Sequence, residues 1–182
     1  QFIVDELAAG SHVTSCEKPV FNDAELFRTD AKCEGNRVVL GGWEVKPGME
    51  PSRSRWFILE LSPAETPYLF KEIRGKVESS WASTSAEVLG SWVGLQLFGK
   101  PSSNVVSSRK TIMRICGGTD NQAAEFLSIK GGSTKLPLTL VMMQLASTLR
   151  EMQLELRLKW RPRELNTEAD ALTNLDIALF DE

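Results

Sequence analysis

Hydrophobic and polar residues alternate along several short segments of the chain, which is the pattern of half-buried β-strands. The predicted strands cover residues 25–31, 38–45, 56–61, 111–117 and 154–160. Short connections containing Gly, Pro or Asn join the first three, which predicts an antiparallel meander. Gly41 and Gly42 lie inside the second strand and indicate a bulge or the close approach of another backbone. In the last strand, leucines alternate with Glu155, Arg157 and Lys159, so one face is apolar and the other largely cationic.

Apolar residues at spacings of three and four predict a helix that begins near Ser85. Its apolar stripe consists of Ala86, Leu89, Val93 and Leu97. Glu87 lies beside this stripe, and Gly90 and Gly94 follow at one-turn intervals. Each glycine costs a helix about 1 kcal/mol relative to alanine. We therefore expect a neighbouring element to need the space that the two glycines leave.

Three further helices are predicted in the second half of the chain. A short one over 121–129 would end at Gly131, because glycine favours the left-handed conformation found there. Pro137 opens the most regular helix, whose apolar face continues to Met152. Asn166 is expected to cap the last helix with its side chain.

The order of these elements predicts an α/β fold. A meander followed by alternating strands and helices implies a mixed five-stranded sheet, with three antiparallel strands, then parallel strands, and helices on both faces. Residues 62–84 are rich in Pro, Ser, Thr and charge, and are expected to form an irregular insertion with a short helix over 68–77. Residues 1–22 are interpreted as a lead-in segment before a domain over 23–182.

Length and composition fit one globular domain. The chain has 182 residues, of which 42% are hydrophobic and 25% charged, enough for one substantial core. Its longest apolar stretch, 136–149, is too polar for a membrane span of about 20 residues. We recognise no secretory signal, and a first residue of Gln1 rather than Met indicates a part of a longer polypeptide.

Cysteine usage and net charge favour neither a zinc site nor a strongly basic surface. Cys16, Cys33 and Cys116 form no CxxC pair, and His12 is the sole histidine. This pattern predicts reduced and inert thiols rather than a metal site or a disulfide. The formal net charge of −3 lacks the basic excess of most nucleic-acid-binding domains, although the local distribution can override the sum.

Four acidic residues lie in apolar surroundings, namely Asp30, Glu87, Asp120 and Asp170. Three of them have ordinary explanations when taken alone: Glu87 can favour a helix N-terminus, Asp120 can serve a turn, and Asp170 can be a solvated helix acid. Asp30 is harder to explain, because carboxylates are disfavoured in strands. Together the four acids predict a metal site assembled from separate elements.

The motifs around these acids resemble, in order, the ribonuclease H domain that follows reverse transcriptase in retroelement polymerases. The motifs are FRTDA at Asp30, GGWEV after it, SAEVLG at Glu87, GGTDNQAA at Asp120 and WRPRELNTEADAL at Asp170. The resemblance spans about residues 24–175. The closing phrase N-x-x-A-D-x-L, which starts at Asn166, is most similar to the retrotransposon and pararetrovirus branch.

The resemblance implies a ribonuclease H-like fold and hydrolysis of the RNA strand of RNA/DNA hybrids with two Mg²⁺ ions, for which Mn²⁺ could substitute. Two such ions activate a water and stabilise the leaving 3′ oxygen. Carboxylate oxygens are hard ligands that suit Mg²⁺. By resemblance, Asp30 would bridge the metals, Glu87 and Asp120 would hold one of them, and Asp170 would hold the other.

Substrate contacts and partners are also implied by the resemblance. The expected contact residues are Gly41, Gly42, Asn121, Arg161, Arg163 and Asn166. Phosphate binding and an ordinary solvated surface remain equal alternatives for the cations on and after the 154–160 strand. Besides the RNA/DNA hybrid, a covalently linked polymerase domain is the expected partner, and no membrane partner is expected.

Two other functions stay open at this point. One is a catalytically inert ribonuclease H-like module that binds nucleic acid or scaffolds an assembly, and the other is a related nuclease or transposase acting on DNA. An exonuclease of that superfamily would carry an early D-x-E pair, whereas the chain has DAK from Asp30. The family's histidine before the last aspartate is absent from 160–167, where Arg161, Arg163 and Glu164 are the candidates to replace it.

Overall fold

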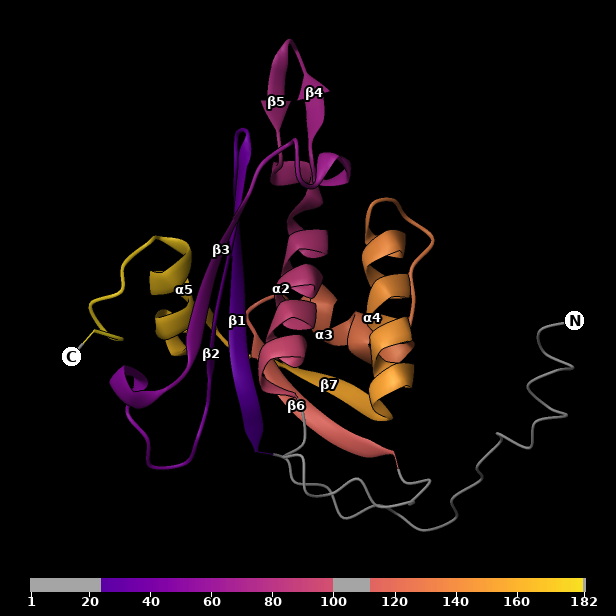
Figure 1. Ribbon diagram of the computed structural model, residues 1–182. Helices are drawn as coiled ribbons and strands as arrows, with labels where there is room; N and C mark the ends of the chain where they lie inside the picture. Colours follow the sequence, from indigo (N-terminus) through magenta and orange to yellow (C-terminus); the bar gives the residue numbers. More distant parts are fainter. Residues whose placement is uncertain (1–23, 100–111, 182) are drawn as a thin grey trace, which may run out of the picture.

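The computed structural model describes residues 24–99 and 112–181, and its principal element is a five-stranded sheet (Figure 1). The strands are β1 (Glu25–Glu34), β2 (Arg37–Glu44), β3 (Trp56–Leu61), β6 (Met113–Thr119) and β7 (Leu154–Trp160). Their spatial order is β3-β2-β1-β6-β7. The lead-in segment 1–22, which includes His12 and Cys16, lies outside the described residues, as does Thr111 in the predicted fourth strand.

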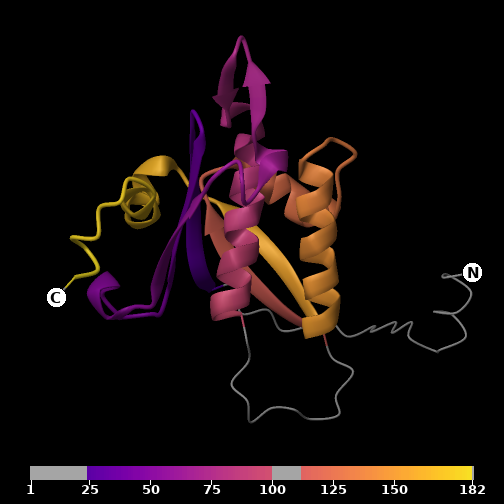
Figure 2. The same ribbon diagram turned by 45° about the horizontal axis from the view of Figure 1, so that its top comes forward.

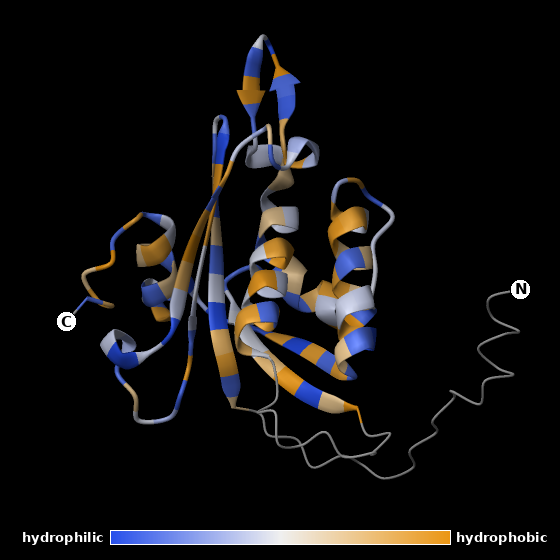
Figure 3. Ribbon diagram, in the orientation of Figure 1, coloured by the Kyte–Doolittle hydropathy of each residue, from blue (hydrophilic) through white to orange (hydrophobic). Residues whose placement is uncertain are grey.

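The strand directions match the predicted arrangement. β1, β2 and β3 pair antiparallel, whereas β6 runs parallel to both β1 and β7. Gly35 adopts a φ of 54° in the tight turn between β1 and β2, a conformation that glycine enters at little cost. In Figure 3 the strand β7 shows alternating hydropathy, as expected where one set of side chains faces the core. The predicted mixed sheet is therefore confirmed.

Helices pack on both faces of the sheet, as predicted (Figures 1 and 2). They are α2 (Ser83–Phe98), α3 (Gln122–Lys130), α4 (Leu138–Met152) and α5 (Thr167–Thr173). α2 and α4 lie side by side over one face, while α5 packs against β1 and β2 on the other. The main core lies under α2 and α4, where Phe27, Leu40 and Leu95 are fully buried. Among the described residues, no helix has both the length and the apolar character needed to span a membrane.

The two glycines of α2 bring this helix close to β1. A Cβ atom at Gly94 would lie 2.9 Å from Cδ2 of Phe27, and one at Gly90 would lie 3.6 Å from the carbonyl oxygen of Asp30. The strand thus occupies the space that the glycines leave open, as expected from the sequence. This close approach also brings Glu87, which precedes Gly90 by about one turn, next to the middle of β1.

Gly41 allows an equally close approach on the opposite face of the sheet. A Cβ atom there would lie 2.8 Å from Cβ of Leu172 and 3.0 Å from the backbone nitrogen of Thr173. Because Gly41 pairs with Asp30 across the β1–β2 ladder, α5 lies directly beside Asp30. The register continues unbroken through Gly41 and Gly42, so close packing rather than a bulge explains these glycines.

Residues 62–84 contain a small hairpin where a helix was predicted. The hairpin consists of β4 (Lys71–Ile73) and β5 (Lys76–Glu78), between 3-10 turns at Pro67–Leu69 and Ser80–Ala82. The helix predicted over 68–77 is wrong, because Arg74 and Gly75 take φ values of 52° and 76° and form a two-residue hairpin turn. Figure 1 shows the hairpin projecting at the end of the molecule where α2 begins.

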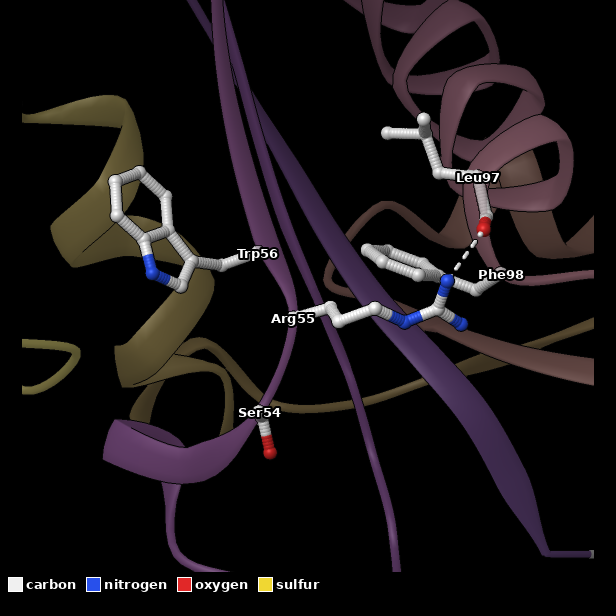
Figure 4. Close-up of a pocket in the computed structure, with 5 residues that line it drawn as sticks. All are labelled: Ser54, Arg55, Trp56, Leu97 and Phe98. Carbon is white, nitrogen blue, oxygen red and sulfur yellow. Dashed lines mark hydrogen bonds between the residues drawn. The ribbon is translucent and has the colours of Figure 1, made fainter.

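The prediction that Leu97 belongs to the buried apolar stripe of α2 is also wrong. Leu97 is 46% exposed, whereas Leu95 and Phe98 are buried. Arg55 holds this end of the helix, since its Nη1 donates to the carbonyl oxygen of Leu97 at 3.2 Å (Figure 4). The same guanidinium makes two hydrogen bonds of 2.9 Å to Glu44, so the charged group in this shallow surface pocket is already engaged.

We expect Gly94→Ala to lower stability relative to Gly90→Ala. Alanine gains about 1 kcal/mol over glycine inside a helix, and the new Cβ fits in ordinary contact at residue 90. At residue 94 it meets the buried Phe27 ring at 2.9 Å, and overpacking costs about 1–3 kcal/mol. Urea unfolding of both variants measures the difference. Equal gains at the two positions would contradict the packing of α2 on β1.

Candidate metal centre

Three of the four acids meet at one point, although each comes from a different element. Asp30 lies in the middle of β1, Glu87 in the second turn of α2, and Asp120 directly after β6. One carboxylate oxygen from each lies within 4.8 Å of the other two. Because Gly118 near the end of β6 is level with Arg28 of β1, the residue that follows β6 reaches the middle of β1. The carboxyl end of a parallel strand is the expected place for a ligand site.

Two of these carboxylates are buried and are oriented by neutral hydroxyl groups. Asp30 and Glu87 are each only 4% exposed. The Thr173 hydroxyl, from α5, donates to Oδ2 of Asp30 at 2.7 Å. The Thr119 hydroxyl donates to Oε2 of Glu87 at 3.4 Å. These contacts fix the side chains without compensating their charge.

Burial raises the pKa of all three carboxyl groups, and repulsion by a neighbouring acid adds to the effect in each case. The pKa of Glu87 is raised well above its usual value of 4.5, first by burial and then by the charges of Asp30 and Asp120. Burial is also the main cause of the raised pKa of Asp30, where the Thr173 hydrogen bond acts in the opposite direction. For Asp120, burial raises the pKa and the charge of Arg163 partly offsets this effect.

The cluster offers what a hard divalent cation requires. Within residues 24–99 and 112–181, no Lys or Arg side chain forms a salt bridge with Asp30, Glu87 or Asp120. The three carboxylates therefore have no directly paired cation among the described residues, and the nearby charge of Arg163 offsets their repulsion only in part. Oxygen ligands of this kind suit Mg²⁺ or Mn²⁺ rather than a thiolate-seeking metal. The residues present thus fit the metal expected from the sequence.

Asp170, the fourth predicted ligand, lies near the cluster but binds other groups. Its Oδ1 accepts from Nε and Nη2 of Arg163 at 3.1 and 2.6 Å, and its Oδ2 accepts from Asn174 at 3.0 Å. Its charge still contributes to the raised pKa of Asp30 and of Asp120. The structure therefore brings three of the acids together and holds the fourth beside them, and metal binding by Asp170 stays a prediction.

Three of the predicted substrate contacts have structural roles. Gly41 and Gly42 are buried in β2, the first under α5 and the second against the Phe57 ring. Their packing is explained in this way, and substrate contact by their backbone stays a prediction. Asn121 caps α3, because its Oδ1 accepts hydrogen bonds from the backbone N–H groups of Ala123 and Ala124. A capping residue next to Asp120 can still face a substrate, and that contact stays a prediction.

Asn166 is buried and does not act as the predicted helix cap. It occupies the N-cap position of α5 without a side-chain capping bond. Its Nδ2 donates instead to the carbonyl oxygen of Thr29 at 3.2 Å. The capping prediction is wrong because this amide ties the start of α5 to β1, one residue before Asp30. The Asn166 side chain is fully buried, and its contact with substrate stays a prediction.

Three arginines on and after β7 are engaged with carboxylates. Arg157 lies 3.3 Å from Glu155, Arg161 lies 2.5 Å from Glu25, and Arg163 pairs with the last aspartate at 2.6 Å. Arg161 therefore ties the end of β7 to β1, and Arg157 pairs within β7 itself, which favours the structural alternative for this face. Arg163 is 71% exposed and lies closest to the candidate site.

Two residues at the site were not identified from the sequence. Thr173, which binds Asp30, follows Asp170 by three residues, and helical spacing could have placed both on one face of α5. Trp160 donates from Nε1 to the backbone carbonyl of Asp120 at 3.0 Å and fixes the chain after β6. No local sequence pattern predicts this contact, because it depends on the pairing of β7 with β6.

The described cysteines take no part in the cluster's ligand set. Cys33 is partly buried and Cys116 is fully buried. Burial, and then the charges of Glu87 and Asp30, raise the pKa of Cys33 to about 12. A thiol with this pKa stays protonated and unreactive near neutral pH, as predicted for Cys33.

Sequence and structure comparisons give different results. No protein-family model and no curated protein matches the chain in sequence. The fold is similar to ribonuclease H1 of Halobacterium salinarum, with a TM-score of 0.53 and 16% identity over 84% of this chain and 96% of that one. It is also similar to LC11 ribonuclease H1, isolated from compost and solved in complex with an RNA/DNA hybrid, with a TM-score of 0.55 and 17% identity over 84% and 95%.

A third similar structure belongs to a viral polyprotein. The native protease-reverse transcriptase of prototype foamy virus matches with a TM-score of 0.51 and 12% identity, over 90% of this chain and 22% of that one. The structural similarity establishes the ribonuclease H fold for the chain. Because the sequence identities are low, the activity has to be argued from the site.

We expect Glu87→Gln to stabilise the metal-free protein and to abolish most of its stabilisation by Mg²⁺. The amide removes a buried charge that repels Asp30 and Asp120. A gain of at least about 1 kcal/mol would raise the melting temperature by roughly 2–4 °C in a chain of this size. Thermal melts in EDTA and in millimolar Mg²⁺ measure both effects. Glu164→Gln, which makes the same change on an exposed residue, should alter neither melt.

The stability of the metal-free protein should depend on pH through the same groups. Because the pKa of Glu87 is raised on folding, the folded state binds its proton more tightly than the unfolded state. Stability should therefore rise as pH falls from neutral through the raised pKa, and level off near the usual value of 4.5. Glu87→Gln should flatten this rise. A metal-free wild type that loses stability steadily from pH 7 to 5 would contradict the buried cluster.

Proposed function

We propose that the chain is a ribonuclease H, which hydrolyses the RNA strand of RNA/DNA hybrids with divalent metal ions. The observation that carries this proposal is the cluster of Asp30, Glu87 and Asp120 at the carboxyl end of a parallel strand in the ribonuclease H fold. Placing like charges together away from water costs stability, and packing alone would not require it. The likeness to LC11 ribonuclease H1 in complex with an RNA/DNA hybrid supports the choice of substrate.

The chain's own residues would hold the ions and orient the reaction. Bound between these oxygens, two Mg²⁺ or Mn²⁺ ions would supply an activated water and stabilise the charge on the leaving 3′ oxygen. Asp30 and Glu87 would bind metal from fixed positions, because the Thr173 and Thr119 hydroxyls already hold their carboxylates. Asp120 is the most accessible of the three and follows the strand end directly, so it would lie closest to an incoming phosphate.

Asp170 would complete the ligand set by exchanging Arg163 for metal. The released guanidinium would then be free to bind a substrate phosphate, for which its planar set of donors is well suited. This exchange would give Arg163 the place of the absent histidine beside the last aspartate. The present pairing supports the proposal by showing that the two side chains reach each other and lie next to the cluster.

We propose more specifically that the chain is the ribonuclease H domain of a retroelement reverse transcriptase and is covalently linked to a polymerase domain. The N-x-x-A-D-x-L phrase at Asn166 and the fold match to part of the foamy virus chain support it. The second candidate is an inert module that binds hybrid without cutting. One specific observation favours it: Asp170 is occupied by Arg163 and Asn174 instead of facing the other three acids.

Cleavage of labelled RNA/DNA hybrid, duplex DNA and single-stranded RNA in Mg²⁺ or Mn²⁺ distinguishes these functions. We expect cutting of the RNA strand of the hybrid, and a loss of at least about a hundredfold, or about 2.7 kcal/mol, in Asp120→Asn. Asp176→Asn, an exposed aspartate beyond α5, is the matched control and should retain activity. Circular dichroism would verify that both variants fold.

Two results would contradict the proposal. Binding of the hybrid without cutting in either metal would assign the inert module. Cutting of duplex DNA in preference to the hybrid would assign a related DNA nuclease.

A further inference from the structure

Three cations without a carboxylate partner gather on the β4–β5 hairpin. Lys71, Arg74 and Lys76 are all exposed, and among the described residues none lies within salt-bridge distance of an acid. This contrasts with Arg157 and Arg161 on the main sheet, which are engaged with glutamates. We call residues 71–78 the basic hairpin. Its cations are free to bind an external anion.

The backbone of the basic hairpin presents these side chains outward. The positive φ angles of Arg74 and Gly75 place the arginine at the tip of a two-residue turn. Lys76 pairs with Ile73, and Lys71 lies opposite Glu78, with Glu72 on the other face. The acid opposite Lys71 does not capture it, because the ammonium nitrogen lies 5.5 Å from the ring centroid of Trp81 instead. The acids therefore leave all three cations available.

Exposed rings lie at the base of the basic hairpin. Trp81 is 40% exposed and Tyr68 is 37% exposed, and both line a surface pocket together with Lys71 and Leu136. Lys135, which precedes Leu136, also lacks a described acidic partner. Cations beside exposed aromatic faces provide phosphate contacts and a stacking surface at once, as in proteins that bind nucleic-acid strands without reading sequence.

The basic hairpin lies shortly before Glu87 along the chain, at the end of the molecule where α2 begins. The 3-10 turn that follows it leads directly into α2, and Glu87 lies four residues after Ser83, about 6 Å along the helix axis. Figure 1 shows the hairpin extending past the N-terminal end of α2, at the end of the molecule toward which β1 runs. A strand held at the carboxylates would continue past this element.

We propose that the basic hairpin, with Trp81 and Lys135 at its base, binds the sugar-phosphate backbone of the hybrid next to the metal centre. This inference rests on the proposed function for the identity of the nucleic acid. It assigns a role to the insertion 62–84, and gives a chain with a formal net charge of −3 a local cationic contact. The contact would not depend on the nucleotide sequence of the hybrid, because it involves phosphates rather than base edges.

Hybrid binding by paired variants tests the proposal. Arg74→Gln combined with Lys76→Gln removes two charges from the basic hairpin. Arg53→Gln combined with Arg150→Gln removes the same charge from a turn before β3 and the C-terminal end of α4. Fluorescence anisotropy in EDTA measures hybrid affinity without cutting, at several salt concentrations. We expect the hairpin variant to bind the hybrid at least about tenfold more weakly than the wild type. The slope of log affinity against log salt concentration should become shallower by about two, and the control should match the wild type in both quantities.

The outcomes separate this inference from the proposed function. Equal affinity and equal salt slope in the hairpin variant and its control would overturn the inference and leave the exposed rings to a protein partner. Wild-type cleavage of the hybrid in Mg²⁺ is measured in parallel. If the wild type does not cut while the hairpin variant still loses affinity, the proposed function fails and the inference stands. If it cuts while hairpin and control variants bind alike, the inference alone fails.

Discussion

Repulsion among three carboxylates gathered within 4.8 Å is the interaction on which the rest of the structure depends. Two of them, Asp30 and Glu87, are removed from water, and an uncompensated buried ion costs several kcal/mol. In the part of the chain that the structure describes, hydroxyl groups orient these acids but no basic side chain pairs with them. Only protons or external cations can complete the site. The raised pKa of each group and the proposed metal chemistry are two consequences of this one conflict.

Close backbone packing on both faces of β1 creates that conflict. Gly94 and Gly90 let α2 approach the strand from one side, and Gly41 lets α5 approach the neighbouring strand from the other. As a result, a helix residue, a strand residue and the first residue after a parallel strand meet at one point. A wider helix–sheet spacing would move Glu87 away from Asp30 and relieve the repulsion. The close packing therefore lowers the stability of the fold and holds the three carboxylates together in advance of any ligand.

The sequence predicted those features that depend on local pattern, and missed those that depend on tertiary contacts. Period-two alternation and glycine positions located the five strands of the main sheet and the end of α3, and Pro137 with its following apolar face located α4. The β4–β5 hairpin was missed, because its Arg-Gly turn is a weaker signal than Asn-Gly and its strands are only three residues long. The meeting of Asp30, Glu87 and Asp120 followed from element order, whereas the pairing of Asp170 with Arg163 depends on side-chain conformations that no spacing specifies.

A Mn²⁺ difference map tests the central claim most directly. Crystals of the protein grown or soaked in Mn²⁺ would be measured near the manganese absorption edge, where anomalous scattering identifies the metal. We expect anomalous density bounded by the carboxylates of Asp30, Glu87 and Asp120. The absence of density there at saturating Mn²⁺, or its presence only at other surface acids, would contradict a metal centre in this fold.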